Sequence, residues 1–134
     1  MTEQQNTGKP DHAIILEADK GLASQIEEYL KNQGYAVFAP LSSEAALDLL
    51  KGQRIQLAFL GNPPEGGSCF DLIKDFVMTS PMTYVILVTD APEKEIHDRA
   101  EGYGILGHVP RAFSPVEIQK LIAKYQEINQ ALRG

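Results

Sequence analysis

The chain is short of cysteine, of long apolar runs and of positive charge, and each shortage excludes a class of protein. Its single cysteine, Cys69, cannot close an internal disulfide, which favours a reducing cytoplasm. No apolar run approaches the roughly 20 residues of a transmembrane helix. The polar residues 1–12 lack the apolar core of a signal peptide. The net charge of −6 disfavours direct binding to nucleic acid or to an anionic membrane.

The composition is that of one ordinary globular domain. A length of 134 residues is enough for one hydrophobic core and too short for two. Hydrophobic residues make up 43% of the chain and charged residues 22%, as expected for a domain folded in water. Residues 1–12 are mostly polar, with glycine and proline among them. We therefore expect a flexible N-terminal tail over residues 1–12 and a folded domain over residues 13–134.

Short apolar runs alternate with stretches of helical period. The runs, at 13–16, 35–39, 55–60, 84–89 and 105–109, are nearly continuous in apolar residues. This pattern is typical of strands that are buried on both faces of a parallel sheet. The stretches between them begin with capping residues, namely Asp19, Ser42 or Ser43, the pair Ser68 and Asp71, and Asp90. The pattern predicts an α/β fold, a doubly wound, five-stranded parallel sheet in which each strand is followed by a helix.

In such a fold the functional crevice lies beyond the carboxyl ends of the strands. Glu17, Ala18 and Asp19 follow the first predicted strand, and Gly61 follows the third. Thr89 ends the fourth strand, and Arg111 follows the fifth. Acids, a hydroxyl and a guanidinium should therefore meet at one edge of the sheet, with no nucleophile at the centre.

Over residues 13–128 this arrangement resembles the receiver domains of response regulators. Members of that family show an acidic pair after strand one, a phosphoacceptor aspartate after strand three, serine or threonine after strand four, and lysine after strand five. Here Glu17 matches the first acid and Thr89 is retained. Ala18, Gly61 and Arg111 replace the second acid, the phosphoacceptor and the lysine. The resemblance implies a CheY-like, flavodoxin-like sheet of order 2-1-3-4-5 and a cytoplasmic role in bacterial phosphorelay (two-component) signalling.

The departures from the family pattern remove the groups needed for phosphoryl transfer and for Mg²⁺ binding. An acyl phosphate needs a carboxylate nucleophile, and Mg²⁺ needs several oxygen ligands. Ala18 and Gly61 take two carboxylates away, so we predict a pseudo-receiver that is not an enzyme and holds no metal or cofactor. Arg111 is a planar fork that suits a bidentate bridge to Glu17 or Asp19, which would fill the pocket. The scattered histidines indicate no zinc site, and no Ser/His/Asp set suggests a hydrolase or transferase.

Two functions remain open. The first is phosphorylation-independent signalling by contact with a protein partner, either a sensor kinase or an output (effector) domain. The second is a small-ligand or anion sensor that uses the vacated pocket with Arg111 and Thr89. For the first, the resemblance implies an interaction face on the fourth helix, fifth strand and fifth helix, which could also form a homodimer. Its residues would be Ile96, Arg99, Ala100, Tyr103, His108, Glu117, Lys120 and Lys124.

Several residues also have simpler interpretations. Asp19 and Asp90 stand where helix N-caps are expected, which would occupy their carboxylates. Cys69 lacks a nearby cysteine or histidine, so a packed thiol is favoured over a reactive one. A surface histidine such as His108 is more often passive than a pH switch. Apolar residues in the last helix continue to Leu132, which fits either a long terminal helix or a contact with another chain or domain.

Overall fold

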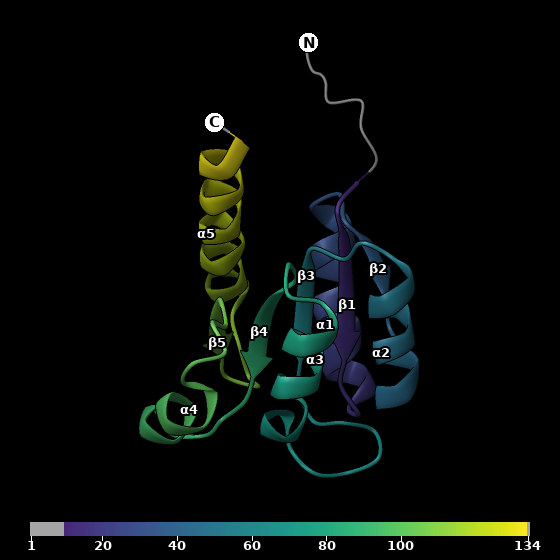
Figure 1. Cartoon of the computed structure of the whole chain (residues 1–134), viewed down its shortest axis with the longest axis vertical. Coiled ribbons are helices and arrows are strands. Elements are labelled where there is room, and N and C mark those ends of the chain that lie inside the picture. Colours follow the sequence, from purple (N-terminus) through teal and green to yellow (C-terminus); the bar gives the residue numbers. More distant parts are fainter. Residues whose placement is uncertain (1–9, 134) are drawn as a thin grey trace.

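The structure is a computed structural model that describes residues 10–133, and its centre is a five-stranded parallel sheet (Figure 1). The strand order is β2-β1-β3-β4-β5, as predicted. The strands are β1 (His12–Leu16), β2 (Ala36–Phe38), β3 (Leu57–Leu60), β4 (Tyr84–Val88) and β5 (Gly107–Val109). In register, Leu16 pairs with Leu60, Leu60 pairs with Leu87, and Val88 pairs with Val109. The carboxyl ends of β1, β3, β4 and β5 therefore lie together at one edge.

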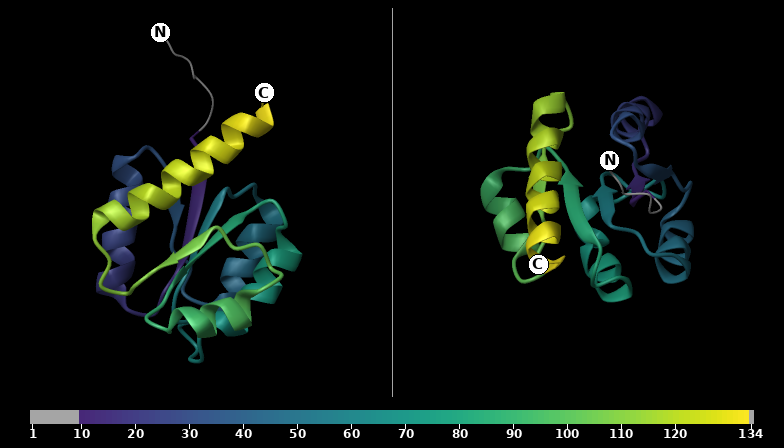
Figure 2. Two further views of the ribbon diagram at one scale, coloured as in Figure 1. Left: turned by 90° about the vertical axis from the view of Figure 1, so that its left-hand side faces the viewer. Right: turned by 90° about the horizontal axis from the view of Figure 1, so that it is seen from above.

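Helices cover both faces of the sheet, as expected for a doubly wound fold. Helices α1 (Lys20–Asn32) and α5 (Pro115–Arg133) pack on one face, over a core that includes Ile15 and Phe59. Helices α2 (Ser43–Gly52), α3 (Ile73–Thr79) and α4 (Glu93–Ala100) pack on the other, over Leu16 and Leu60. Figure 2 shows α5 running obliquely across its face of the sheet. Because both faces are covered, alternate residues of each central strand are equally buried, which explains the continuous apolar runs.

Local capping signals set the starts of α1 and α2 as predicted. The Asp19 carboxylate accepts the N–H of Leu22 at 3.1 Å and caps α1, and the Ser42 hydroxyl caps α2. Ser68 and Asp71 form the expected capping box, but it opens a short 3₁₀ helix, η1 (Cys69–Asp71), and α3 begins only at Ile73. These caps were predictable because each joins residues two or three positions apart.

The folded domain starts earlier than predicted. His12 belongs to β1, and the carbonyl oxygen of Asp11 accepts the N–H of Ala36 at 3.0 Å. The carboxylate of Asp11 also accepts the hydroxyl of Tyr125 on α5 at 2.6 Å. Residues 11 and 12 are therefore part of the amino-terminal end of the sheet, and residues 1–9 of the predicted tail lie outside the described residues. Within residues 10–133 no helix combines the length and hydropathy needed to cross a membrane.

Candidate functional site

The site at the carboxyl edge of the sheet is centred on the Glu17 carboxylate. Glu17 directly follows β1, and its side chain is only 1% exposed. Its two oxygens accept the backbone N–H groups of Asp19 at 2.8 Å and of Asn62 at 3.0 Å. The first of these bonds closes the turn into α1, and the second joins β1 to the loop after β3. A carboxylate this deeply buried is stable only when such donors and a positive charge surround it.

Arg111 supplies that positive charge. Its Nη1 donates to Glu17 Oε1 at 2.7 Å, and its Nη2 donates to Glu17 Oε2 at 2.9 Å. The bidentate bridge predicted from the sequence is therefore confirmed, with Glu17 as the partner, while Asp19 caps α1. Since β3 and β4 lie between β1 and β5 in the sheet, the bridge spans the whole central part of the carboxyl edge.

The bridge shifts the pKa of both partners toward the charged pair. Burial raises the pKa of Glu17, but the hydrogen bonds from Arg111, Asp19 and Asn62 together lower it further, to below its ordinary value of 4.5. The hydrogen bond to Glu17 raises the pKa of Arg111, and this outweighs the opposite effect of burial. Both groups are therefore charged at neutral pH.

Asp90 holds the same arginine from its backbone. The Asp90 carboxylate accepts the N–H of Arg111 at 2.9 Å. The predicted N-cap role of Asp90 is wrong, because Pro92 stands at the N-cap position of α4 and makes no side-chain cap bond. Arg111 is thus fixed at both ends, its main chain by the loop after β4 and its guanidinium by β1.

Thr89 and Cys69 form a separate contact next to the bridge. The Thr89 hydroxyl accepts the N–H of Ala91 at 3.1 Å, and it lies close enough to the Cys69 thiol to oppose the rise in the pKa of that thiol. Cys69 is 2% exposed, and burial raises its pKa above the ordinary 9.0. The interpretation of Cys69 as a packed thiol is confirmed. Ala18 brings no side-chain function to the site, since it is exposed and its N–H donates to the carbonyl of Asn62.

The edge therefore offers little to a cation. The Glu17 oxygens are taken by four donors, and the Asp19 and Asp90 carboxylates accept backbone N–H groups. Among residues 10–133 no group of three or more histidine, cysteine, aspartate or glutamate side chains is arranged to hold a metal ion.

Comparisons with known proteins agree with this architecture. A solved receiver domain of a response regulator from Methanospirillum hungatei JF-1, described as CheY-like, superposes with a TM-score of 0.78 at 17% identity and covers 91% of this chain and 98% of its own. The signal receiver domain of an HD domain-containing protein from Pseudomonas fluorescens Pf-5 gives a TM-score of 0.80 at 16% identity, with 98% of each chain covered. The chain has the fold of a CheY-like receiver domain.

Sequence similarity points in the same direction. The regulatory protein VanR of Enterococcus faecium is 26% identical over 110 residues, which are 81% of this chain and 46% of VanR. The chain thus spans about half the length of that curated relative. No protein-family model matches the chain. The chain therefore has the fold of a receiver domain and is similar in sequence to VanR over 81% of its own length.

The predicted interaction face of this receiver-like domain is only partly as expected. Arg99, Lys120 and Lys124 are exposed, and His108 and Glu117 are half-buried. Ile96 is 5% exposed and belongs to the core under α4, as does Ala100, so neither can be a free contact residue. Tyr103, expected to be exposed, is half-buried and packs on the same core. Ile96 and Ala100 lie four positions apart on one side of α4, and that side packs on the core.

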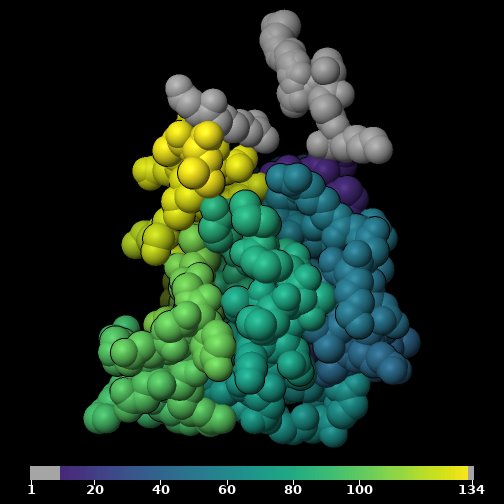
Figure 3. Space-filling model, in the orientation of Figure 1, coloured from purple at the N-terminus to yellow at the C-terminus, as the bar shows by residue number. Residues whose placement is uncertain are grey.

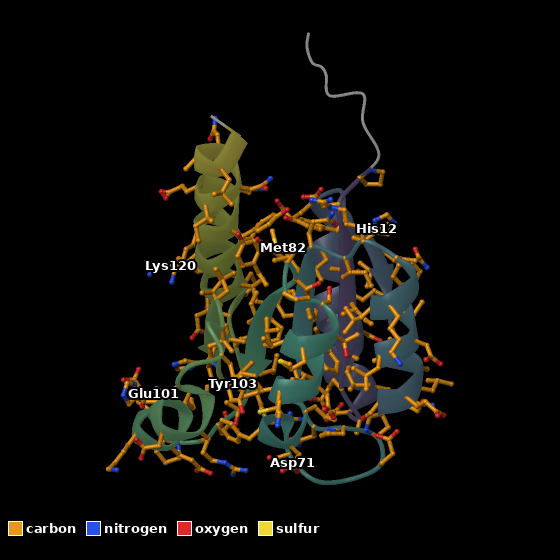
Figure 4. The ribbon with its side chains drawn as sticks, viewed as in Figure 1. His12, Asp71, Met82, Glu101, Tyr103 and Lys120 are labelled. Atoms are coloured by element: carbon orange, nitrogen blue, oxygen red, sulfur yellow. The ribbon has the colours of Figure 1, made fainter. Side chains whose placement is uncertain are left out.

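Charged side chains nevertheless gather along this side of the domain. Figure 4 shows Glu101, at the end of α4, and Lys120, on α5, pointing away from the sheet, while Tyr103 lies between α4 and the centre of the molecule. In the space-filling view, α4 forms a corner of the molecule and the end of α5 lies above it on the same side (Figure 3). Lys124 donates to the carbonyl of Leu106 at 3.2 Å. Leu132, near the end of α5, is 71% exposed.

Sequence reasoning missed a groove between α4 and β5. The groove has a volume of about 340 Å³. Its apolar side chains come from α4 and from the loop before β5. Its rim carries two acids and two histidines, which face each other as His97 with Glu101 at 3.6 Å and His108 with Glu93 at 3.9 Å. The four-residue spacing of Ile96 and Ala100 signals the apolar side of α4, but nothing local signals the gap beside β5. The lining residues are Glu93, Ile96, His97, Ala100, Glu101, Ile105, Gly107 and His108.

Proposed function

We propose that the chain is a two-component signalling module that acts by protein–protein contact, without being phosphorylated itself. The observation that carries the proposal is the Glu17–Arg111 bridge, which fills the carboxyl edge beside a glycine at the phosphoacceptor position. Similarity to VanR, described as a regulatory protein, supports a regulatory role. The proposal includes a cytoplasmic location, no catalytic activity, no bound cofactor or metal, and no direct contact with nucleic acid.

The groove between α4 and β5 is the proposed docking site for the partner, which would be a sensor kinase or an output domain. Its apolar floor would accept an aliphatic or aromatic side chain. Glu93 and Glu101 on its rim favour a partner segment that also carries lysine or arginine. Lys120 and Lys124 on α5 would extend the contact toward acidic groups of the same partner. A homodimer through this face is an alternative use of the same surface.

The ligand-sensing function has less support than docking of a protein partner. An anion would need the Arg111 fork, and both of its terminal nitrogens donate to Glu17. The Thr89 hydroxyl accepts the N–H of Ala91. A ligand would therefore have to displace a charged, mostly buried pair before it could bind, at a cost of several kcal/mol.

Photo-crosslinking in cells tests the docking site. A photoreactive phenylalanine analogue placed at Glu101, beside the groove, should give a discrete crosslinked product. The same analogue at Ser24, on the outer surface of α1, is the control and should not give that product. A product of twice the chain mass would identify the homodimer. Crosslinks that form only from Ser24 would show that the partner uses a different face.

Intact-mass spectrometry tests independence from phosphorylation. After incubation with acetyl phosphate and Mg²⁺, we expect no added phosphoryl group, because residue 61 has no carboxylate to attack phosphorus and release acetate. An acid-labile adduct approaching one phosphoryl group per chain would refute this part of the proposal while leaving the docking site untouched.

A further inference from the structure

The glycine at position 61 is not required by the backbone. The glycines with positive φ among the described residues are Gly34, Gly66, Gly67, Gly102 and Gly104. Gly61 is not one of them, and its N–H donates to the carbonyl of Leu16 at 2.9 Å. Any L-amino acid with a backbone N–H could adopt this extension of the β1–β3 pairing. The reason for a glycine must therefore lie in what surrounds it.

The neighbour that decides the matter is the Glu17 carboxylate. A Cβ atom built on Gly61 would overlap Glu17 Oε1 and lie 3.0 Å from its Cδ. A flexible side chain could usually move aside, but this carboxylate is fixed by the N–H groups of Asp19 and Asn62 and by both nitrogens of the Arg111 fork. Moving it would break charged hydrogen bonds in a buried place.

We infer that the absence of a side chain at Gly61 leaves the volume that the Glu17 carboxylate needs for its bridge to Arg111. The bridge and any side chain at position 61 would therefore exclude one another. The glycine then does more than remove a phosphoacceptor. It allows the Glu17–Arg111 contact, which joins the end of β1 to the loop before α5. One consequence is that a carboxylate restored by Gly61→Asp would compete with Glu17 for the same volume and could not take up a phosphoryl group while the bridge is in place.

A thermal-unfolding cycle tests the inference on the full chain. Gly61→Ala is made in the wild type and in Glu17→Ala, which removes the overlapping atoms. In the wild type we expect the melting temperature to fall by on the order of 5–10 °C, as for overpacking of a tight site. In the Glu17→Ala background the same change should cost less than about 2 °C. Gly52→Ala is the matched control, since a Cβ there has no neighbour within 4 Å.

Each outcome decides between exclusion and another cause. If Gly61→Ala fails to fold and the Gly61→Ala/Glu17→Ala double variant folds, the exclusion holds in its strongest form. If Gly61→Ala lowers the melting temperature equally in both backgrounds, the cost comes from something other than Glu17 and the inference is overturned. It is equally overturned if Gly61→Ala leaves the melting temperature of the wild type unchanged.

Discussion

Replacing Arg111 by alanine should destabilise the fold by about 2 kcal/mol. The change removes two charged hydrogen bonds of 2.7 and 2.9 Å and leaves a carboxylate whose side chain is 1% exposed. Removing one partner of a fully buried pair costs about 3–5 kcal/mol. Two features reduce that value here. The Arg111 side chain is 24% exposed, so water screens the pair, and the N–H groups of Asp19 and Asn62 still hold Glu17.

Urea unfolding at pH 7, followed by far-UV circular dichroism, measures this cost directly. The free energy of unfolding should depend on urea concentration with the same slope in both proteins, and only the midpoint should fall in Arg111→Ala. Lys94→Ala is the control, because Lys94 pairs with Asp98 on the surface, where the two side chains are 88% and 54% exposed. That pair should contribute less than about 0.5 kcal/mol. If Arg111→Ala costs no more than Lys94→Ala, the bridge does not stabilise the protein and our reasoning about the site is wrong.

The same pair predicts how the difference depends on pH. The folded-state pKa of Glu17 lies below its ordinary value of 4.5, because the hydrogen bonds from Arg111, Asp19 and Asn62 outweigh the opposing effect of burial. A carboxyl group with a lowered pKa stabilises the folded state fully above pH 4.5, and this contribution is lost as the pH falls through the folded pKa. The gap between wild type and Arg111→Ala should therefore be widest near neutral pH and narrow below pH 4.5. A gap that stays constant on acidification would contradict the assignment of Glu17 as the partner.

Three further outcomes are expected. Mg²⁺ should bind more weakly than roughly millimolar, since one buried, already bridged carboxylate is a poor site; a saturable rise in melting temperature at lower concentration would disprove this. Tyr125→Phe should cost about 1–2 kcal/mol, because Asp11 loses a hydroxyl donor at 2.6 Å, and a midpoint in urea equal to that of wild type would show that water replaces it. Cys69, 2% exposed with a raised pKa, should react with iodoacetamide at least about tenfold faster in urea than in buffer; equal rates would mean the thiol is accessible in the fold.

The sequence alone determined the sheet and most of the helix starts. Continuous apolar runs predict strands buried on both faces, and the two core clusters on opposite faces of the sheet agree with that reading. Asp19, Ser42 and the Ser68–Asp71 box act within two or three residues of themselves. Such contacts form wherever the local backbone forms, so they can be read without knowing the rest of the chain.

The charge on Arg111 and the acids near it were visible in the sequence, but the choice among them was not. Arg111 pairs with Glu17, 94 residues away in the sequence. Asp90, which was expected to cap a helix, instead accepts the backbone N–H of Arg111, 21 residues away. Which acid meets the guanidinium depends on how the strand ends converge at one edge. The local rules for caps treat Asp19 and Asp90 alike, and only the position of the loop after β5 separates them.

Which residues on the side of α4 are buried was also decided only by the tertiary structure. Ile96 and Tyr103 were assigned to an exposed face from the family pattern, yet both contact the core. The groove lies between α4 and β5, and no periodicity in the sequence encodes how far apart these two elements stand. Position 61 shows the same division. The sequence reveals a glycine where an aspartate was expected, and the fold supplies the reason, since the Glu17 carboxylate held by Arg111 occupies the volume that a side chain would need.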